Sequence, residues 1–131
     1  MNEMRPPFLD LLGCTIEDVD QEVGTCTMLF RISEQLCHSG NIVQGGFITA
    51  MLDTVSSHAV FGCDHDITGV STLDLRVNFY KANHPGKIKA IGKIEKLSRN
   101  FAFLSAELFN SDGERTASLF SSAKVSRKDK A

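Results

Sequence analysis

The sequence lacks an excess of charge of either sign. Its 131 residues contain 14 Lys and Arg against 16 Asp and Glu, which gives a formal net charge of −2. Nucleic-acid-binding domains normally carry a basic patch, because contacts to phosphates supply much of their binding energy. The slightly acidic balance therefore argues against nucleic acid as a partner.

A long hydrophobic run is also missing. The least polar stretch, residues 42–61, is interrupted by Gln44, Asp53 and His58. A membrane-spanning helix needs about 20 consecutive and mainly apolar residues, and residues 1–7 contain no apolar run of the kind found in signal peptides. We therefore expect a cytoplasmic protein with no membrane partner.

Patterns typical of disulfide frameworks and metal sites are absent as well. The four cysteines form no C-x-x-C pair and are spaced irregularly: Cys14, Cys26, Cys37 and Cys63. Free thiols in a reducing compartment are the expectation. The histidines lack H-E-x-x-H spacing, and Cys63–Asp66 is more typical of a surface loop than of metal ligands. With no phosphate-binding loop, dinucleotide fingerprint or G-x-S-x-G motif, we expect no metal and no separate cofactor.

Two segments have helical character. Residues 6–13 begin with two prolines and end with a glycine, which is typical of a short helix. Residues 43–61 are apolar in nearly every direction around a helix, which predicts one long and buried helix. The length fits a single domain spanning residues 1–131.

The other segments alternate between apolar and polar residues, as β-strands do. One strand, 23–32, precedes the long helix and about four follow it, while residues 126–131 form a charged tail that we expect to fray. In the first later strand, one face is expected to carry Leu73, Leu75, Val77 and Phe79, and the other Thr72, Asp74, Arg76 and Asn78. A curved antiparallel sheet could cover the helix, so we expect an α+β fold with a long central helix wrapped by the sheet and preceded by a short N-terminal helix.

Gln44-Gly45-Gly46 stands at the start of the long helix. The first helical turn offers unpaired N–H groups and the positive end of the helix dipole, and glycine lets a ligand approach the backbone closely. Such a site suits a carbonyl oxygen that gains negative charge during attack. The alternative is that the two glycines only let the helix pack tightly against the sheet.

Asp53 is the only carboxylate between Glu34 and Asp64, and it lies among apolar residues of the helix. Burial of a carboxylate is costly unless the group is paired or used. This favours a functional residue over a solvated one, or one bonded to Thr54 or Ser57.

The spacing of Gln44 and Asp53 constrains how they could cooperate. They are nine positions apart, so at ~100° and ~1.5 Å per residue they point to opposite sides of the helix, about 13 Å apart along its axis. Asp53 therefore cannot act on a carbonyl held at the N-terminus of its own helix. A catalytic function requires a homodimer whose sites lie at the interface.

Two further sets of residues, a pair of hydroxyl residues and a set of basic residues, could have either a functional or a purely structural role. Ser71 and Thr72 could orient a water or the carboxylate, or they could be ordinary strand hydroxyls. The basic residues of the second half either cover a solvated sheet face or contact the phosphates of a carrier such as coenzyme A. These residues are Lys81, Lys87, Lys89, Lys93, Lys96 and Arg99.

Segments Asn41–Phe47 and Ala50–Asp53 resemble the central-helix motif of hotdog-fold acyl-CoA thioesterases of the phenylacetate-degradation (PaaI-like) type. That motif usually reads His-Gly-Gly, followed by an acid nine positions after the His, and here Gln44 replaces the His. Leu73–Phe79 and Asp112-Gly113 also resemble the family's sheet, so the resemblance covers residues 7–125. It implies a hotdog fold and hydrolysis of acyl-CoA to a free acid and coenzyme A, which belongs to the substrate and is not a cofactor.

The resemblance also implies roles for individual residues. The Gly45 N–H, with Gly46 beside it, would donate to the acyl carbonyl, and Gln44 would orient the thioester. Asp53 of the partner chain would act as a general base on water, or attack as a nucleophile to give an anhydride. Thr72, or Ser71 beside it, would position the water.

The remaining implied roles lie outside the helix. His38 falls where relatives often place an Asn that assists the acid, and Asn41 is the alternative for that role. Arg99 corresponds to a residue that contacts the nucleotide end of coenzyme A. The expected assembly is a homodimer that pairs into a dimer of dimers.

Two rival functions share this fold. One is a non-catalytic acyl-CoA-binding protein, which would bind thioesters without turnover. The other is a dehydratase or hydratase of hydroxyacyl thioesters, which generally needs a catalytic His where Gln44 stands. A fold alone does not decide among these functions.

Overall fold

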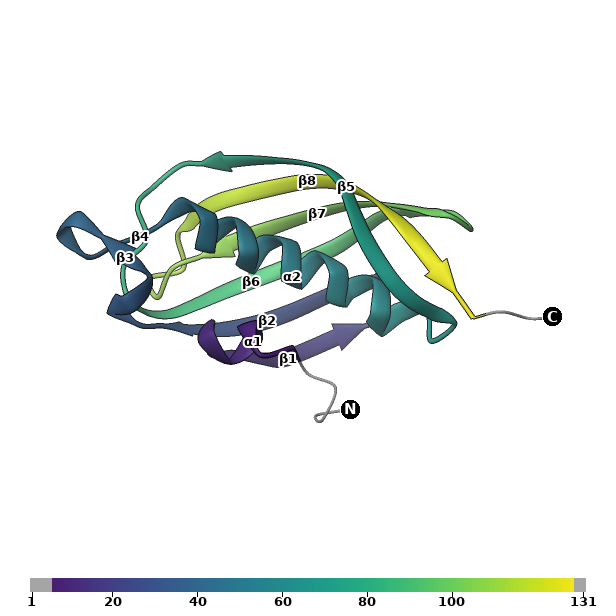
Figure 1. Ribbon diagram of the computed structural model, residues 1–131, viewed down its shortest axis with the longest axis horizontal. Helices are drawn as coiled ribbons and strands as arrows, with labels where there is room; N and C mark the ends of the chain where they lie inside the picture. Colours follow the sequence, from purple (N-terminus) through teal and green to yellow (C-terminus); the bar gives the residue numbers. More distant parts are fainter. Residues whose placement is uncertain (1–5, 129–131) are drawn as a thin grey trace.

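A computed structural model describes residues 6–128 of the protein. In it a long helix, α2, lies in the concave face of a curved six-stranded sheet (Figure 1). The strand order is β1-β2-β6-β7-β8-β5, and every neighbouring pair is antiparallel. The elements are α1 (Phe8–Leu11), β1 (Cys14–Asp20), β2 (Thr25–Ile32), β3 (Cys37–His38), β4 (Ile42–Val43), α2 (Gly45–Cys63), β5 (Ile67–Phe79), β6 (Gly86–Leu97), β7 (Phe101–Phe109) and β8 (Arg115–Arg127).

This arrangement confirms the predicted α+β architecture with its long central helix and short N-terminal helix. One strand of the large sheet was not predicted. In β1 only Cys14 is buried, and the strand carries Glu17, Asp18 and Asp20 on an edge of the sheet. An edge strand exposed on both faces shows no apolar alternation, so the pattern that identifies other strands is missing.

The C-terminal segment also differs from its prediction. Ser126 and Arg127 continue β8 and do not fray. The Arg127 guanidinium lies 2.7 Å from a carboxylate oxygen of Asp64 and donates to the Arg99 carbonyl at 2.8 Å. Residues 129–131 of the predicted tail lie outside the described residues.

The core forms between α2 and the concave face of the sheet. The helix buries a stripe of residues at helical spacing: Ile48, Met51, Leu52, Val55 and Ala59. These contact inward-facing residues of the strands, including Met28, Phe30, Ala90 and Leu119. The opposite side of α2 is not fully covered by its own chain, since Phe61 is exposed and Phe47 only partly buried.

Gly92 sets how closely α2 approaches the sheet. A Cβ at this position of β6 would stand 2.5 Å from the Val55 carbonyl oxygen and 2.9 Å from the Ser56 Cα. Both atoms belong to the helix backbone, so a side chain at position 92 cannot be accommodated by a rotamer change.

We therefore expect Gly92→Ala to lower the free energy of unfolding by about 1–3 kcal/mol, the usual cost of overpacking a core. Urea denaturation measures this change. Gly69→Ala is the matched control, because its Cβ would meet only Ser126 side-chain atoms at 3.6 Å or more. Equal stability of both variants would contradict the close helix–sheet contact.

A β-bulge in β5 changes which side chains face the helix. The pairing with β8 shifts between Thr72, opposite Ala123, and Asp74, opposite Ser122. The strict alternation predicted from the sequence, with Thr72 on the face of Asp74, is therefore wrong. Because the bulge inserts one residue, Thr72 shares the concave face with Leu75, which pairs with Ser121.

Strand β5 ends the sheet and curls over the C-terminal half of α2 (Figure 1). Its outer edge has no neighbouring strand among residues 6–128. Leu73, Leu75 and Phe79 along this edge are exposed. An edge that carries unpaired backbone groups and apolar side chains is typical of an interface.

Candidate active site

The N-terminus of α2 is capped by Gln44. Its Oε1 accepts a hydrogen bond from the Gly46 N–H at 2.8 Å, while its backbone is extended, as N-cap residues usually are. The Gly46 amide is therefore occupied. The Gly45 N–H meets no acceptor among the described residues, and it remains available for a ligand.

The two glycines have different surroundings. A Cβ at Gly46 would stand 2.7 Å from Gln44 Oε1, so a side chain there would displace the capping oxygen. A Cβ at Gly45 would lie 3.5 Å from the Phe79 ring, an ordinary contact. The alternative that the Gly pair serves tight packing on the sheet is not supported, because the close helix–sheet approach occurs at Gly92.

Asp53 lies in the middle of α2 and is half-buried. Its Oδ1 accepts a hydrogen bond from the Thr72 hydroxyl at 2.9 Å. The bulge in β5 makes this contact possible, because it turns Thr72 toward the helix. Within residues 6–128 no donor is bonded to the second carboxylate oxygen, so Asp53 is oriented and can still accept a proton.

Ser71 does not join this pair. It is exposed and stands opposite Lys124 of β8, on the other face of the strand from Thr72. The sequence did not decide whether Ser71 or Thr72 could orient the carboxylate. The structure brings only the Thr72 hydroxyl to Asp53.

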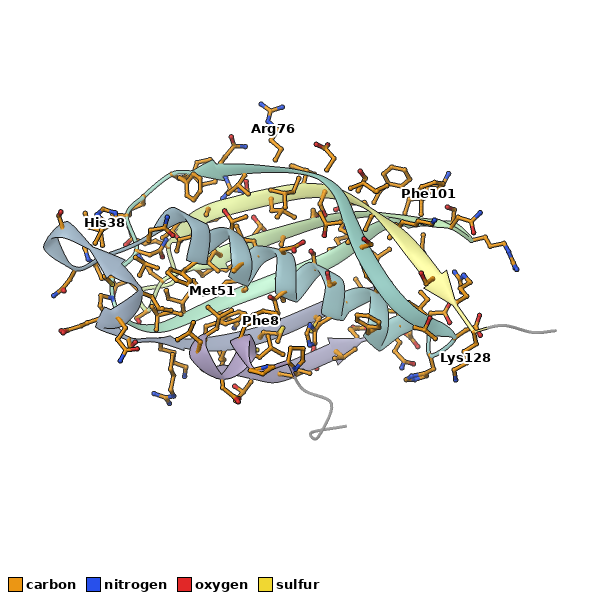
Figure 2. All side chains as sticks on the ribbon, viewed as in Figure 1. Phe8, His38, Met51, Arg76, Phe101 and Lys128 are labelled. Atoms are coloured by element: carbon orange, nitrogen blue, oxygen red, sulfur yellow. The ribbon has the colours of Figure 1, made fainter. Side chains whose placement is uncertain are left out.

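His38 and Asn41 lie beyond the N-terminal end of α2 and are exposed. Asn41 has a positive φ of 57°, and its carbonyl is hydrogen-bonded to the His84 ring at 3.0 Å. Arg99 lies in the turn between β6 and β7, two residues before Phe101, which Figure 2 shows at the opposite end of the molecule from His38. One chain therefore does not bring His38, Asn41 or Arg99 to Asp53.

A cavity of about 330 Å³ lies beside Gly45. Most of its wall is apolar, with Val43, Ile48 and Phe79 among the lining residues. Asn83 also lines it, is 3 % exposed, and has a buried Oδ1 with no hydrogen-bond partner among the described residues. Asn83 does not stand out in the sequence, because a single Asn between two strands is indistinguishable from a loop residue.

The four cysteines are free thiols, and two of them are unsuited to nucleophilic attack. Burial, with a smaller contribution from Cys14, raises the pKa of the Cys26 thiol to about 11. Burial and then Asp20 raise the pKa of Cys63. A thiol with a raised pKa stays protonated near neutral pH, and the thiolate is the nucleophile.

The described part of the chain contains no cluster of three or more His, Cys, Asp or Glu residues able to hold a metal ion. Among residues 6–128, no helix is both long enough and apolar enough to cross a bilayer.

Residues 40–117 match the model of the thioesterase superfamily. The structure of a phenylacetic acid degradation-related protein from Ralstonia eutropha superimposes with a TM-score of 0.87 at 28 % identity, covering 92 % of this chain and 91 % of that one.

Two other proteins are similar. The PaaI protein of E. coli shares the fold, with a TM-score of 0.84 at 14 % identity, covering 98 % of this chain and 88 % of that one. A candidate esterase of Sulfurisphaera tokodaii is 24 % identical over 106 residues, which are 81 % of this chain and 77 % of that protein.

Proposed function

The chain belongs to the thioesterase superfamily, has the hotdog fold and is a thioester hydrolase; we propose that it hydrolyses acyl-coenzyme A at sites formed between two copies of the chain. The observation that carries this proposal is the Asp53–Thr72 hydrogen bond. It orients a carboxylate on α2 and leaves one oxygen unbonded within the described chain. A carboxylate held in this way can activate a water molecule.

In the proposed reaction, a water oxygen forms a bond to the thioester carbonyl carbon while Asp53 takes the water proton. The carbonyl oxygen becomes negative, and the carbon–sulfur bond then breaks. Coenzyme A leaves as a thiolate and takes up the proton that Asp53 accepted, which returns Asp53 to its carboxylate form. The alternative is direct attack by Asp53, which forms an acyl anhydride that water hydrolyses. Thr72 positions the carboxylate in either case.

The second half of the site comes from the helix N-terminus. The Gly45 N–H, which has no acceptor in the described chain, donates to the carbonyl oxygen as negative charge develops. Gln44 holds the first turn through its bond to Gly46 and directs its amide NH₂ to the thioester. The apolar wall that contains Phe79 and Ile48 receives part of the substrate beside Gly45.

The separation of the two halves on α2 requires a homodimer. Asp53 lies nine residues after Gln44, about 13 Å farther along the axis and on the other side of the helix. Pairing of two β5 edges would cover Leu75 and Phe79 and bring Asp53 of one chain toward Gly45 of the other. The exposed apolar edge supports this arrangement.

Arg99 is proposed to contact the nucleotide end of coenzyme A. It is exposed in a turn whose backbone is held by Arg127, through the Arg99 carbonyl at 2.8 Å and the Ser98 carbonyl at 3.3 Å. His38 is proposed to assist Asp53 of the partner chain, with Asn41 as the alternative for that role, on the basis of the family resemblance.

The test is thiol release from a panel of short, long and aromatic acyl-CoAs. We expect saturable turnover with at least one of them, and a higher KM for the matching acyl-pantetheine, which lacks the nucleotide. Saturable binding without thiol release from any acyl-CoA would contradict the hydrolase and favour a binding protein. Equal KM values for both carriers would contradict recognition of the nucleotide.

A further inference from the structure

The side-chain amide of Asn83 is buried without a hydrogen-bond partner. The residue is 3 % exposed, and its Oδ1 meets no donor among the described residues. Its Nδ2 is not hydrogen-bonded within residues 6–128 either. Burial of a polar group costs free energy unless a partner satisfies it. An unsatisfied amide in a folded chain therefore points to a partner that the chain itself does not supply.

This amide lies at the wall of the cavity beside Gly45. Asn83 lines the cavity together with Gly45, Ile48 and Phe79. Strand β5 ends near the point where α2 begins (Figure 1), so the cavity lies between the segment that leaves β5 and the first turn of the helix. Within the described chain, the Gly45 N–H has no acceptor and the Asn83 amide has no partner. One mostly apolar cavity therefore holds two polar groups that a ligand can satisfy.

The backbone around the cavity is fixed by hydrogen bonds. The Asn83 carbonyl accepts from the Val43 N–H at 2.8 Å, directly before the Gln44 cap, and the Tyr80 N–H donates to the Thr116 carbonyl of β8 at 2.8 Å. The side-chain amide, in contrast, is unbonded in residues 6–128. A half-turn about its Cβ–Cγ bond exchanges oxygen and nitrogen without breaking a hydrogen bond. Asn83 can therefore present an acceptor or a donor at a fixed place in the cavity.

We propose that the Asn83 side chain hydrogen-bonds the amide group of the thiol carrier that lies nearest to the thioester sulfur, which makes Asn83 a determinant of carrier specificity. In coenzyme A, two CH₂ groups separate this amide from the sulfur, so it lies close to a thioester carbonyl held by Gly45. A secondary amide offers one N–H and one C=O, and an asparagine side chain can pair with either. The inference deepens the proposed function and rests on its assignment of the Gly45 N–H to the thioester carbonyl.

The exposure of the cavity wall favours the carrier over the acyl group. Tyr80 and Lys81 line the cavity and are about half exposed, so the cavity opens to solvent. The carrier arm has to leave the site toward solvent, because it ends in a large and charged nucleotide. An acyl group has no such need. A hydroxyl donor on the acyl group is the competing occupant, and the choice of substrate separates the two.

The test compares two small carriers that bear the same acyl group. N-acetylcysteamine keeps the amide, whereas O-acetyl-2-mercaptoethanol has the same length and carbonyl but an ester oxygen in place of the N–H. We expect kcat/KM for thiol release by the native protein to be about 5–100-fold higher with the amide carrier, because the ester leaves Asn83 Oδ1 buried and unpaired. In Asn83→Leu the ratio is expected to be near one, through a loss on the amide carrier alone.

Tyr80→Phe is the matched control. Tyr80 lines the same cavity, but its hydroxyl is already hydrogen-bonded to Ser118 Oγ at 2.7 Å, so its removal is expected to keep the native ratio. Asn83→Ala, which adds no side-chain volume, replaces Asn83→Leu if that variant fails to fold, with the same expected ratio. A native ratio near one, or a native ratio retained without the Asn83 amide, would overturn the proposal. An equal loss in Tyr80→Phe would overturn the assignment to Asn83.

A second pair of substrates tests the competing occupant. Acyl groups with and without a terminal hydroxyl are compared on N-acetylcysteamine. We expect the native protein and Asn83→Leu to discriminate equally between these two acyl groups. A preference for the hydroxyl that Asn83→Leu loses, together with an amide preference that it keeps, would assign Asn83 to the acyl group and overturn the proposal.

Binding keeps this inference separate from the proposed function. Pantetheine that carries a 2-oxoalkyl group on its sulfur keeps the carrier amide and a carbonyl but cannot be hydrolysed. Calorimetry is expected to give a Kd about 5–100-fold higher for Asn83→Leu than for the native protein. That difference, with no thiol release from any acyl-CoA, would uphold the role of Asn83 and refute the hydrolase. Native turnover with equal Kd values would uphold the hydrolase and overturn the role of Asn83.

Discussion

Replacement of Asp53 by Asn is expected to lower kcat for acyl-CoA hydrolysis by about 10²–10⁴-fold, the usual contribution of a general base. Asn has nearly the same shape and keeps an oxygen that can accept from the Thr72 hydroxyl, so the fold and the dimer are expected to persist. It cannot take a proton from water or attack as a carboxylate. Thiol release measures kcat, and circular dichroism with molar mass confirms that the variant is intact.

Thr72→Val separates orientation of the carboxylate from its chemistry. This change removes the hydroxyl that bonds Asp53 Oδ1 at 2.9 Å and keeps the β-branched shape. A hydrogen bond to a charged group contributes about 1.5–3 kcal/mol, so we expect kcat to fall by about 10–100-fold, less than for Asp53→Asn.

Turnover of Asp53→Asn close to the native rate, in a folded dimer, would exclude Asp53 as base and as nucleophile.

Gln44→Glu is expected to lower kcat by about 10²–10³-fold, the loss seen when one donor to a developing oxyanion is removed. Native Gln44 uses its Oε1 to cap Gly46 and has its NH₂ left for the substrate. The Glu carboxylate can keep the cap, and the helix dipole favours a negative charge there by about 0.3–1 kcal/mol. The substitution removes the NH₂ donor of Gln44, however, and places a negative charge near the carbonyl oxygen of the substrate. We therefore expect a stable but slow enzyme, measured by thiol release and thermal unfolding.

Gln44→Ala is the control that loses both functions of the side chain. Removal of an N-cap costs about 1 kcal/mol, so Tm is expected to fall below that of Gln44→Glu while kcat falls similarly. If Gln44→Glu retained the native kcat, the side chain would serve only as the cap at Gly46.

Local features of the structure were predictable because their causes are local. The long helix is predicted by apolar residues around every side of residues 43–61, and the structure places it at Gly45–Cys63. The Gln44-Gly45-Gly46 motif was correctly assigned to the helix N-terminus. The use of the Gln44 side chain as the cap was not foreseen, since Gln is not among the usual N-cap residues.

Features that depend on strand pairing were decided only by the tertiary structure. Strand β1 has no apolar alternation and exists because β2 offers it a hydrogen-bonding edge. Thr72 reaches Asp53 because its pairing with β8 introduces a bulge, and a shift of one residue moves a side chain to the other face. The exposure of Phe103 and Phe120 likewise follows from which face of the sheet α2 covers.

The sequence by itself therefore determined the helix, its N-terminal motif and the acid nine residues later, because short-range periodicity and chemistry specify them. Only the tertiary structure decided which hydroxyl holds Asp53 and which apolar residues remain on the surface. The physical reason is that register and sheet curvature depend on contacts between segments far apart in the chain.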